Sequence, residues 1–450
     1  ENLKWKWPNR LCRLAVLRMA SCGCGYATLD ELDDSSLHRK DLLPNTSVSS
    51  LIDNLSIGRF HALHLCRMIL VNAAFAVTME SVPYTFSGME LQFGLTRIQL
   101  ASYVSAFGAG AVCGAVLVAL QDQYGRRSVI RIGAFLSSVF SLLIALCESY
   151  TGVLCLRVAL GLSFGVMQYG FGSWYTEFLP INGRGPLYVA LTAGYPLGRA
   201  VAISVAWALG GSHFRVLQFL PAALLAIVFA ASLAIAESPR FLFIKGDLAG
   251  AYATLRYVYA FNGVPFPVST SDELLRQHRA RAAEGRHAAW GAWKQRLLRL
   301  WVRQPKVLYY AVVLFAGVSM QQSLIFAWGP RVFQRLLYPK KDRHSGGSLP
   351  FPTLLGWNFA DWFGIIASIL LIDRLGRRRF FTVGFLAAGF LWAIFGAVNP
   401  LCNAINAGDT AQLMALIAVG ALAQATRGFA PEAANLWALE SFPTEERATC

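Results

Sequence analysis

The sequence carries one pattern of charged and turn-forming residues twice, in the same order, and each copy follows a long apolar stretch. The upstream part reads Asp122-Gln-Tyr-Gly125-Arg126-Arg127 and recurs as Asp373-Arg-Leu-Gly376-Arg377-Arg378. The downstream part recurs at identical spacing, first as Trp174, Glu177, Pro180 and Arg184, then as Trp437, Glu440, Pro443 and Arg447. Parallel blocks of membrane spans, related by an axis along the membrane normal, surround a central path in many membrane proteins. The duplication therefore indicates two repeated bundles of spans.

Composition supports a membrane protein that crosses the bilayer many times. The 450 residues are 55% hydrophobic and 14% charged, with a mean hydropathy of +0.46. A soluble chain carries roughly 25% charged residues, and a helical span needs about 20 apolar residues. Ten stretches are predicted to be spans: 63–84, 98–120, 129–147, 151–173, 186–209, 214–236, 307–329, 353–372, 380–399 and 412–437.

The distribution of basic residues predicts orientation. The net charge is +15, but Lys and Arg gather in short segments between apolar runs and do not form one basic face. This distribution argues against nucleic-acid binding and is typical of loops held on the cytoplasmic side. The stretch 331–343 is an exception, because it is basic although the predicted orientation places it on the non-cytoplasmic side. We predict an integral multi-pass protein with a cytoplasmic N-terminus.

The predicted fold is all-α, with two pseudo-symmetric six-helix bundles of which about ten spans are present. Residues 1–61 are expected to be a loosely ordered cytoplasmic extension, 62–240 the N-terminal six-span bundle, 241–306 a basic cytoplasmic linker and 307–450 four spans of the C-terminal bundle. The first half continues for two spans after Arg184, so two more are expected after Cys450.

One amphipathic helix is predicted inside the linker. Leu248, Tyr252, Leu255 and Tyr259 fall at helical spacing. Asp247 is a plausible start, and Asn262-Gly263 is a plausible stop. We expect a helix on the surface of the protein.

The duplicated charges can be explained in two ways. Two or three basic residues in a short loop are enough to fix topology, but topology requires neither the Asp, the Gly, nor a second copy. Carboxylates paired with Arg on neighbouring spans can hold a gate and release it, and we favour this interpretation. The predicted gating network consists of Asp122, Gly125, Arg126, Arg127, Glu177, Arg184, Asp373, Gly376, Arg377, Arg378, Glu440 and Arg447.

These motifs resemble the twice-repeated loop motif of the major facilitator superfamily. Arg157-Val-Ala-Leu-Gly161-Leu-Ser-Phe-Gly165 is similar to its fourth-span motif, and Glu237-Ser-Pro239-Arg240 to its sixth-span ending. Within the superfamily the chain is most similar to the synaptic vesicle 2-related branch, which borders the organic-ion and sugar transporters. The resemblance implies a transporter fold. Val77 departs from the acidic pair that branch members often carry in the first span, leaving Glu80.

Ionisable residues at membrane depth are costly and usually face a cavity or a partner. Arg199 and Arg427 lie about 20 Å into their predicted spans. They are candidate contacts for an anion or carboxylate, or partners for the acidic residues. The alternative is a buried structural pair between helices. The candidate solute or proton site consists of Glu80, Arg157, Gln168, Tyr169, Arg199, Gln321, Gln322, Asp361, Arg427 and Glu432.

Small residues predict close packing and a bend. Pairs of glycines four residues apart allow helices to approach closely, and they occur at Gly110/Gly114, Gly161/Gly165 and Gly194/Gly198. Pro196 and Gly198 are expected to bend the fifth span.

The predicted function is secondary active transport of a small organic solute, an organic ion or a sugar-like molecule, by alternating access. Protons are a candidate coupling ion through Glu80 or Asp361. We expect a monomer in the bilayer without cofactor or metal, and the sequence contains no nucleophile–base spacing or phosphate loop typical of an enzyme. The alternative is a transporter-like membrane receptor or trafficking protein that does not transport.

Overall fold

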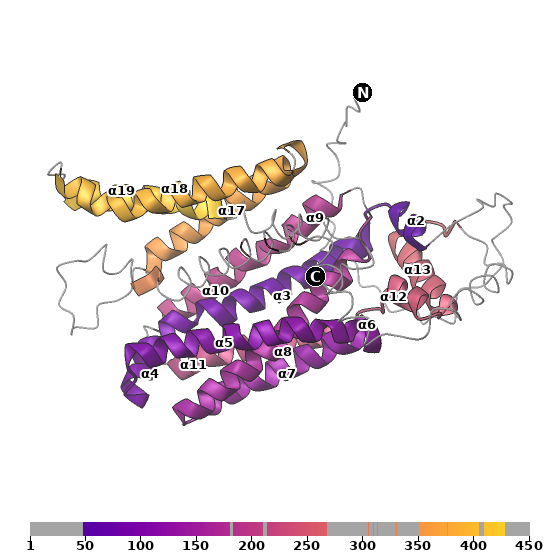
Figure 1. Ribbon diagram of the computed structural model, residues 1–450, viewed down its shortest axis with the longest axis horizontal. Coiled ribbons are helices and arrows are strands. Elements are labelled where there is room, and N and C mark those ends of the chain that lie inside the picture. The colour runs from indigo at the N-terminus through magenta and orange to yellow at the C-terminus, as the bar shows by residue number, and fades with distance from the viewer. Residues whose placement is uncertain are drawn as a thin grey trace. The chain divides into compact units, whose positions relative to one another are not determined.

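The computed structural model describes residues 48–180, 183–209, 214–267, 351–375, 377–404 and 409–427, with Pro305, Tyr309, Val313 and 329–331. The chain divides into two units, Glu1–Pro44 and Asn45–Cys450, and every described residue lies in the second. Within these ranges each regular element is a helix (Figure 1). The all-α prediction is confirmed.

The first half contributes the longest apolar run of helices. Its elements are α3 (Arg59–Glu80), α4 (Val82–Phe93), α5 (Arg97–Leu117), η1 (Val118–Leu120), α6 (Gln121–Tyr124), α7 (Arg126–Leu146), α8 (Tyr150–Thr176), α9 (Arg184–Ala190), η2 (Leu191–Ala193), α10 (Gly194–Ala208) and α11 (Phe214–Leu233). The remaining elements are α2 (Val48–Asp53), α12 (Pro239–Ile244), α13 (Leu248–Asn262), α17 (Phe351–Leu375), α18 (Arg377–Ala404) and α19 (Asp409–Arg427).

Seven helical runs in the described ranges are long and apolar enough to cross a membrane. They correspond to the predicted first six spans and to the eighth. The apolar parts of α18 and α19, Thr382–Val398 and Ala411–Thr426, are shorter. The predicted seventh span falls almost wholly outside the described residues, as does the end of the tenth beyond residue 427.

Glycine pairs bring the helices of the first half into backbone contact. A Cβ added at Gly110 of α5 would lie 2.0 Å from the carbonyl oxygen of Val158 in α8, and one at Gly161 would lie 2.1 Å from that of Phe107. The two helices therefore leave no room for a side chain where they cross. A Cβ at Gly194 or Gly198 of α10 would likewise meet α3 backbone at 2.2 Å. The predicted close packing is confirmed.

The fifth span is interrupted near the predicted bend. Its helix is broken by the 3₁₀ turn Leu191–Ala193, which directly precedes the α10 turn that contains Pro196. Proline has no N–H to donate to the carbonyl four residues earlier, and its ring crowds that carbonyl. The irregularity therefore lies just upstream of Pro196, whereas Gly198 serves close packing.

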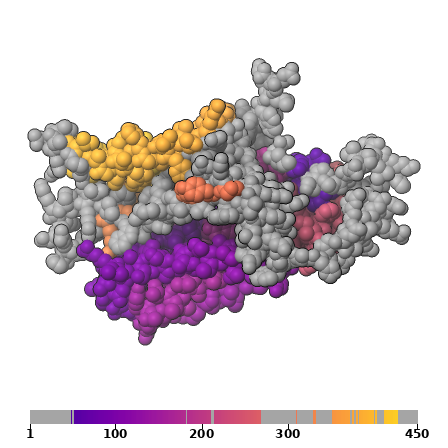
Figure 2. Space-filling model, in the orientation of Figure 1, coloured from indigo at the N-terminus to yellow at the C-terminus, as the bar shows by residue number. Residues whose placement is uncertain are grey.

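The two halves share a buried apolar cluster. Ile203 of α10 and Leu217 of α11 belong to the same cluster as Leu354 and Trp357 of α17 and Phe395 of α18. Elsewhere, large apolar side chains are exposed, among them Ile132, which is 60% exposed, and Phe390, which is 67% exposed. Exposed apolar surface of this extent suits contact with lipid. In Figure 2 the residues of the first half, in purple and magenta, form a large part of the visible surface.

The predicted linker helix is confirmed as α13. Asp247 caps its first turn by accepting a hydrogen bond from the Gly250 amide at 2.9 Å, and Gly263 ends it with φ 73°. Its apolar face does not lie open, because Tyr252 and Leu255 pack against α2. The expectation of a loosely ordered extension is therefore wrong for 48–53. The apolar spacing of Val48, Leu51, Ile52 and Leu55 is the helical signal that marks this segment.

Candidate functional site

The principal site is a buried charge cluster between α3, α10 and α17, here called the Arg199 triad: Glu80, Arg199 and Asp361. Arg199 Nε donates to Glu80 Oε1 at 2.8 Å, and Arg199 Nη1 forms an ion pair with Asp361 Oδ2. The three side chains are 5–7% exposed. Arg199 lies about 22 Å along its span from Arg184, and Asp361 about 15 Å from the start of α17. Glu80 is the last residue of α3, but the helical run that contains it extends from Arg59 to Phe93, so all three residues lie well inside their spans.

Two amides extend the triad into the second half. Asn358 Oδ1 accepts a hydrogen bond from Arg199 Nη1 at 3.4 Å, and its Nδ2 donates to the Pro196 carbonyl at 2.8 Å. Gln424 Nε2 of α19 donates to Asp361 Oδ2 at 3.2 Å. Asn358 and Gln424 are not among the candidates predicted from the sequence. Their polar side chains within apolar helices were the available signal.

The charges of the triad do not cancel. Among the described residues one guanidinium faces two carboxylates, so these three side chains carry one net negative charge when both carboxylates are ionised and are neutral with one proton bound. A charge imbalance in a dry site is costly. A group with this charge has the chemistry to take up a proton or another cation. Of the contacts that the sequence offered for Arg199, the pairing with acidic residues is the one seen among the described residues.

A second charge cluster, here called the Arg126 cluster, lies where α6, α7 and α8 meet at one end of the first half. Arg126 Nη2 contacts Asp122 Oδ1 at 2.9 Å and Glu177 Oε1 at 3.1 Å. Its guanidinium also lies 5.0 Å from the centre of the Phe241 ring. The Arg126 side chain is 6% exposed, and those of Asp122 and Glu177 are 30% and 15% exposed. Asp122, Arg126 and Glu177 of the first copy of the motif thus form one compact network.

Glu237 belongs to this network although the predicted set omitted it. Its carboxylate accepts hydrogen bonds from the backbone amides of Arg126 and Arg127 at 3.0 and 3.2 Å, at the N-terminus of α7. An anion is favourable there because the first amides of a helix lack partners within the helix. Gly125 turns the chain into α7 with φ 93°, and a Cβ at this position would lie 2.6 Å from Glu237 Oε2.

The other predicted gating residues are only partly described. Arg127 is exposed, and its backbone is what contacts Glu237. Arg184 Nη2 donates to the Leu179 carbonyl at 2.9 Å. The predicted gating residues of the second copy lie outside the described part of the chain. These are the side chains of Asp373, Arg377 and Arg378, and the residues Gly376, Glu440 and Arg447.

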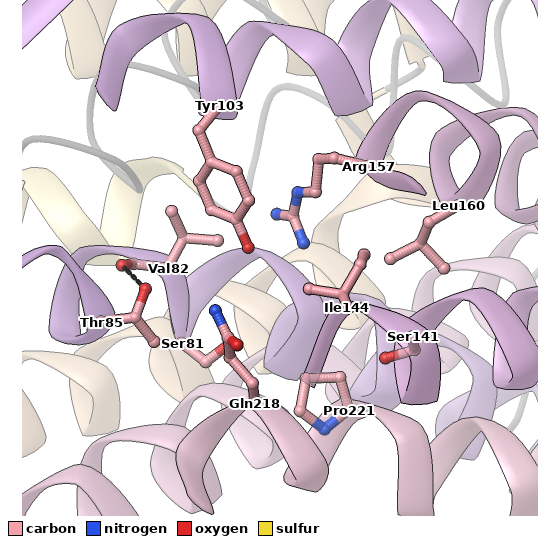
Figure 3. Close-up of a pocket in the computed structure, with 10 residues that line it drawn as sticks. All are labelled: Ser81, Val82, Thr85, Tyr103, Ser141, Ile144, Arg157, Leu160, Gln218 and Pro221. Atoms are coloured by element: carbon pink, nitrogen blue, oxygen red, sulfur yellow. Dashed lines mark hydrogen bonds between the residues drawn. The ribbon is translucent and has the colours of Figure 1, made fainter. Parts of the chain in front are cut away.

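The remaining candidates do not join the Arg199 triad through any contact in the described residues. Gln168 Nε2 donates to the Tyr195 hydroxyl at 3.3 Å, and Tyr169 is 56% exposed. Arg157 is buried in a separate cavity (Figure 3). Three candidates and one side chain fall outside the described part of the chain: Gln321, Gln322, Glu432 and the side chain of Arg427.

Comparisons with known proteins agree with this architecture. The family model described as "Sugar (and other) transporter" matches residues 67–450. The "Synaptic vesicle 2-related protein" of Rattus norvegicus is 23% identical over 434 residues, covering 93% of this chain and 75% of the relative. The "Organic cation/carnitine transporter 7" of Arabidopsis thaliana is 26% identical over 345 residues, covering 67% of this chain and 66% of the relative.

A solved structure shares the fold. The proton:xylose symporter XylE bound to 6-bromo-6-deoxy-D-glucose superposes with a TM-score of 0.63 at 15% identity, covering 87% of this chain and 84% of XylE. Likeness at this identity concerns the fold alone. The family match shows that the chain belongs to the sugar (and other) transporter family, as a membrane transporter of small solutes, and the solved structure shows that it has the major facilitator fold.

Proposed function

We propose that the chain carries a small organic ion across the membrane by alternating access, and that the Arg199 triad couples this movement to protons. The observation that supports the proposal is the ion pair between Arg199 of the first half and Asp361 of the second, both deeply buried. Alternating access moves one half against the other around a central site. Such a movement must break or remake this pair.

Protons can control the pair because the triad holds two carboxylates and one cation. Binding of one proton neutralises a carboxylate and removes the attraction that joins it to Arg199. A proton on Asp361 would loosen the contact between the halves, and a proton on Glu80 would loosen the contact within the first half. A cationic group on a solute can replace the proton, because it also cancels the excess negative charge.

This charge balance favours an organic cation over a neutral sugar as the solute. The name of the Arabidopsis relative refers to organic cations and carnitine, and a relative from Acinetobacter baylyi is named a niacin transporter. XylE is a proton:xylose symporter. We therefore rank organic cations first, zwitterions and organic acids next, and sugars last.

The Arg126 cluster is the proposed brace of the inward mouth. On the predicted orientation it faces the cytoplasm, and its three elements converge on one guanidinium. Losing either carboxylate would weaken the joint between α7 and its neighbours. The Asp122→Asn variant should therefore increase the reactivity of cysteines placed at that mouth and reduce solute uptake. If cysteine reactivity and solute uptake are both unchanged, the Arg126 cluster does not help to close the inward mouth.

The transport proposal is tested with the full-length protein in liposomes. Uptake of radiolabelled organic cations, carnitine, niacin and xylose is measured with and without an outwardly directed proton gradient, because a solute that replaces the proton enters in exchange for it. We expect the gradient to stimulate uptake of a cation by wild type and to have no effect in the Asp361→Asn variant. Asp247→Asn is the matched control, because Asn caps α13 as well as Asp does and the site is not touched.

Two outcomes would contradict the proposal. If the gradient stimulates solute uptake equally in Asp361→Asn and wild type, the triad does not couple transport to protons. No uptake and no thermal stabilisation by any solute in the panel would favour the non-transporting receptor or trafficking protein.

A further inference from the structure

A cavity lies at the end of the first half opposite the Arg126 cluster. The lining residues Tyr103, Arg157 and Gln218 lie about 6–10 Å along α5, α8 and α11 from the first residue of each helix. Ser81 and Thr85, near the α3–α4 junction, and Ser141 of α7 complete its polar lining. Figure 3 shows the Arg157 guanidinium, the Tyr103 hydroxyl and the Gln218 amide directed toward the same space.

Arg157 is a buried cation without an acidic partner among the described residues. Its exposed fraction is 4%, and its hydrogen bond to protein runs from Nη2 to the Thr78 carbonyl at 3.2 Å. Its Nε–H is buried and has no hydrogen-bond partner. The guanidinium lies 4.8 Å from the Tyr103 ring centre and 5.1 Å from that of Phe107. Aromatic faces stabilise a cation by about 2 kcal/mol when desolvated but do not neutralise it.

The lining of the cavity is rich in donors and lacks negative charge. None of the described residues that line it is Asp or Glu. Hydroxyl, amide and guanidinium groups can all donate to an anion. A water molecule could accept one of these hydrogen bonds but would leave the charge of Arg157 uncompensated, which is costly at membrane depth.

The size of the cavity decides between a halide and a larger anion. Its volume is about 10 Å³, which is roughly the space of a single water molecule. A carboxylate on an organic solute would not fit without displacing the helices. Chloride is larger than a water molecule, so its entry requires side chains of the lining, such as those of Ser141 and Gln218, to turn outward, but not a displacement of the helices.

We propose that this cavity binds a chloride ion, which neutralises Arg157 and ties together the ends of α5, α7, α8 and α11. The site is separate from the Arg199 triad and does not depend on the solute. Chloride acts as a structural ligand of the first half, held by the guanidinium and by the Tyr103 hydroxyl.

The proposal is tested by the thermal stability of the purified full-length protein in detergent. Sodium chloride or bromide replaces sodium gluconate at constant ionic strength, with gluconate as the anion that is too large to enter. We expect a saturable rise in Tm with both halides, and no halide dependence in Arg157→Gln. Tyr103→Phe keeps the aromatic face and loses one donor, so its halide affinity should fall about 3- to 10-fold.

Arg215→Gln is the matched control, because Arg215 lies near the same end of the bundle and its Nε bonds the exposed Gln92 side chain at 3.2 Å. It should retain the wild-type halide response. If Arg157→Gln does not fold, the halide affinity of Tyr103→Phe and anomalous diffraction from bromide-soaked crystals test whether the cavity binds a halide. A wild-type Tm that is equal in chloride and gluconate would overturn the proposal, as would a bromide peak absent from the cavity.

Discussion

Replacing Arg199 by Gln is the sharpest test of the charge cluster between the halves. Glu80 and Asp361 are 6% and 5% exposed at their side chains, and both form ion pairs with the Arg199 guanidinium. The substitution leaves two buried carboxylates without the cation they share. We therefore expect Arg199→Gln to be strongly destabilised, and Asp361→Asn to be tolerated because one cation and one carboxylate remain.

The magnitude follows from the burial of the three groups. Truncating one partner of a buried ion pair costs about 3–5 kcal/mol. Asp361 keeps its hydrogen bond from Gln424, which places the expected loss for Arg199→Gln at about 3–4 kcal/mol. This loss corresponds to roughly a 100- to 1,000-fold change in the unfolding equilibrium. Adding Asp361→Asn to Arg199→Gln should restore about 1–3 kcal/mol, since it removes one unpaired carboxylate.

The assay is reversible unfolding in mixed detergent micelles, followed by tryptophan fluorescence, for wild type, both single variants and the double variant. Asp247→Asn serves as the control for an acid-to-amide change outside the spans. A double variant whose loss equals the sum of the two single losses would refute the reasoning. The carboxylate and guanidinium would then contribute independently, and the triad could not act as one charge-balanced unit.

Three further predictions concern the frame around the site. Arg126→Gln should cost about 3 kcal/mol, because two mostly buried carboxylates lose their cation, and thermal unfolding in detergent measures this. Gly161→Ala should lower Tm, because its Cβ would lie 2.1 Å from the Phe107 carbonyl oxygen and force α5 and α8 apart. Tyr259→Phe removes a 2.7 Å hydrogen bond to the Leu51 carbonyl, so proteolysis within α2 should become about 2- to 10-fold faster. Burial raises the pKa of Tyr259, so this contact should stabilise fully below pH about 10, the ordinary tyrosine pKa, and weaken as pH rises through the folded value.

Matched controls isolate each of these effects. Arg127→Gln removes the neighbouring exposed arginine and should leave the free energy of unfolding within about 0.5 kcal/mol of wild type. Gly172→Ala lies on the same helix as Gly161, where a Cβ meets nothing within 4 Å. If a variant and its control lose equal stability, the contact assigned to the substituted residue does not stabilise the protein. For Tyr259→Phe, cleavage of α2 at the wild-type rate would show that the hydrogen bond to Leu51 does not hold α2 in place.

Local signals in the sequence predicted much of the fold. Apolar length located the first six spans and the eighth, since a helix must cover the thickness of the bilayer. Asp247 and Gly263 marked the ends of α13 because capping is decided within one turn. The repeated spacing of Asp122, Arg126 and Glu177 predicted a network, and the first copy assembles one.

Contacts between distant segments were not predictable in the same way. The sequence offered Arg199 several acidic partners, because periodicity along one helix does not say which helix lies opposite. Glu237 was missed because it binds backbone amides of α7, and amides carry no residue-specific signal. Asn358 gained its significance through its position three residues before Asp361, which places both on the same face of α17.

The hydrogen bond from Asn358 to the Pro196 carbonyl means that two kinds of contact join the halves. The ion pair between Arg199 and Asp361 depends on pH, whereas the hydrogen bond to the backbone at the helix irregularity does not. Acidification alone would therefore weaken the contact between the halves without separating them, and the change to the opposite state would also require that hydrogen bond to break, which a bound solute could bring about by reshaping α10.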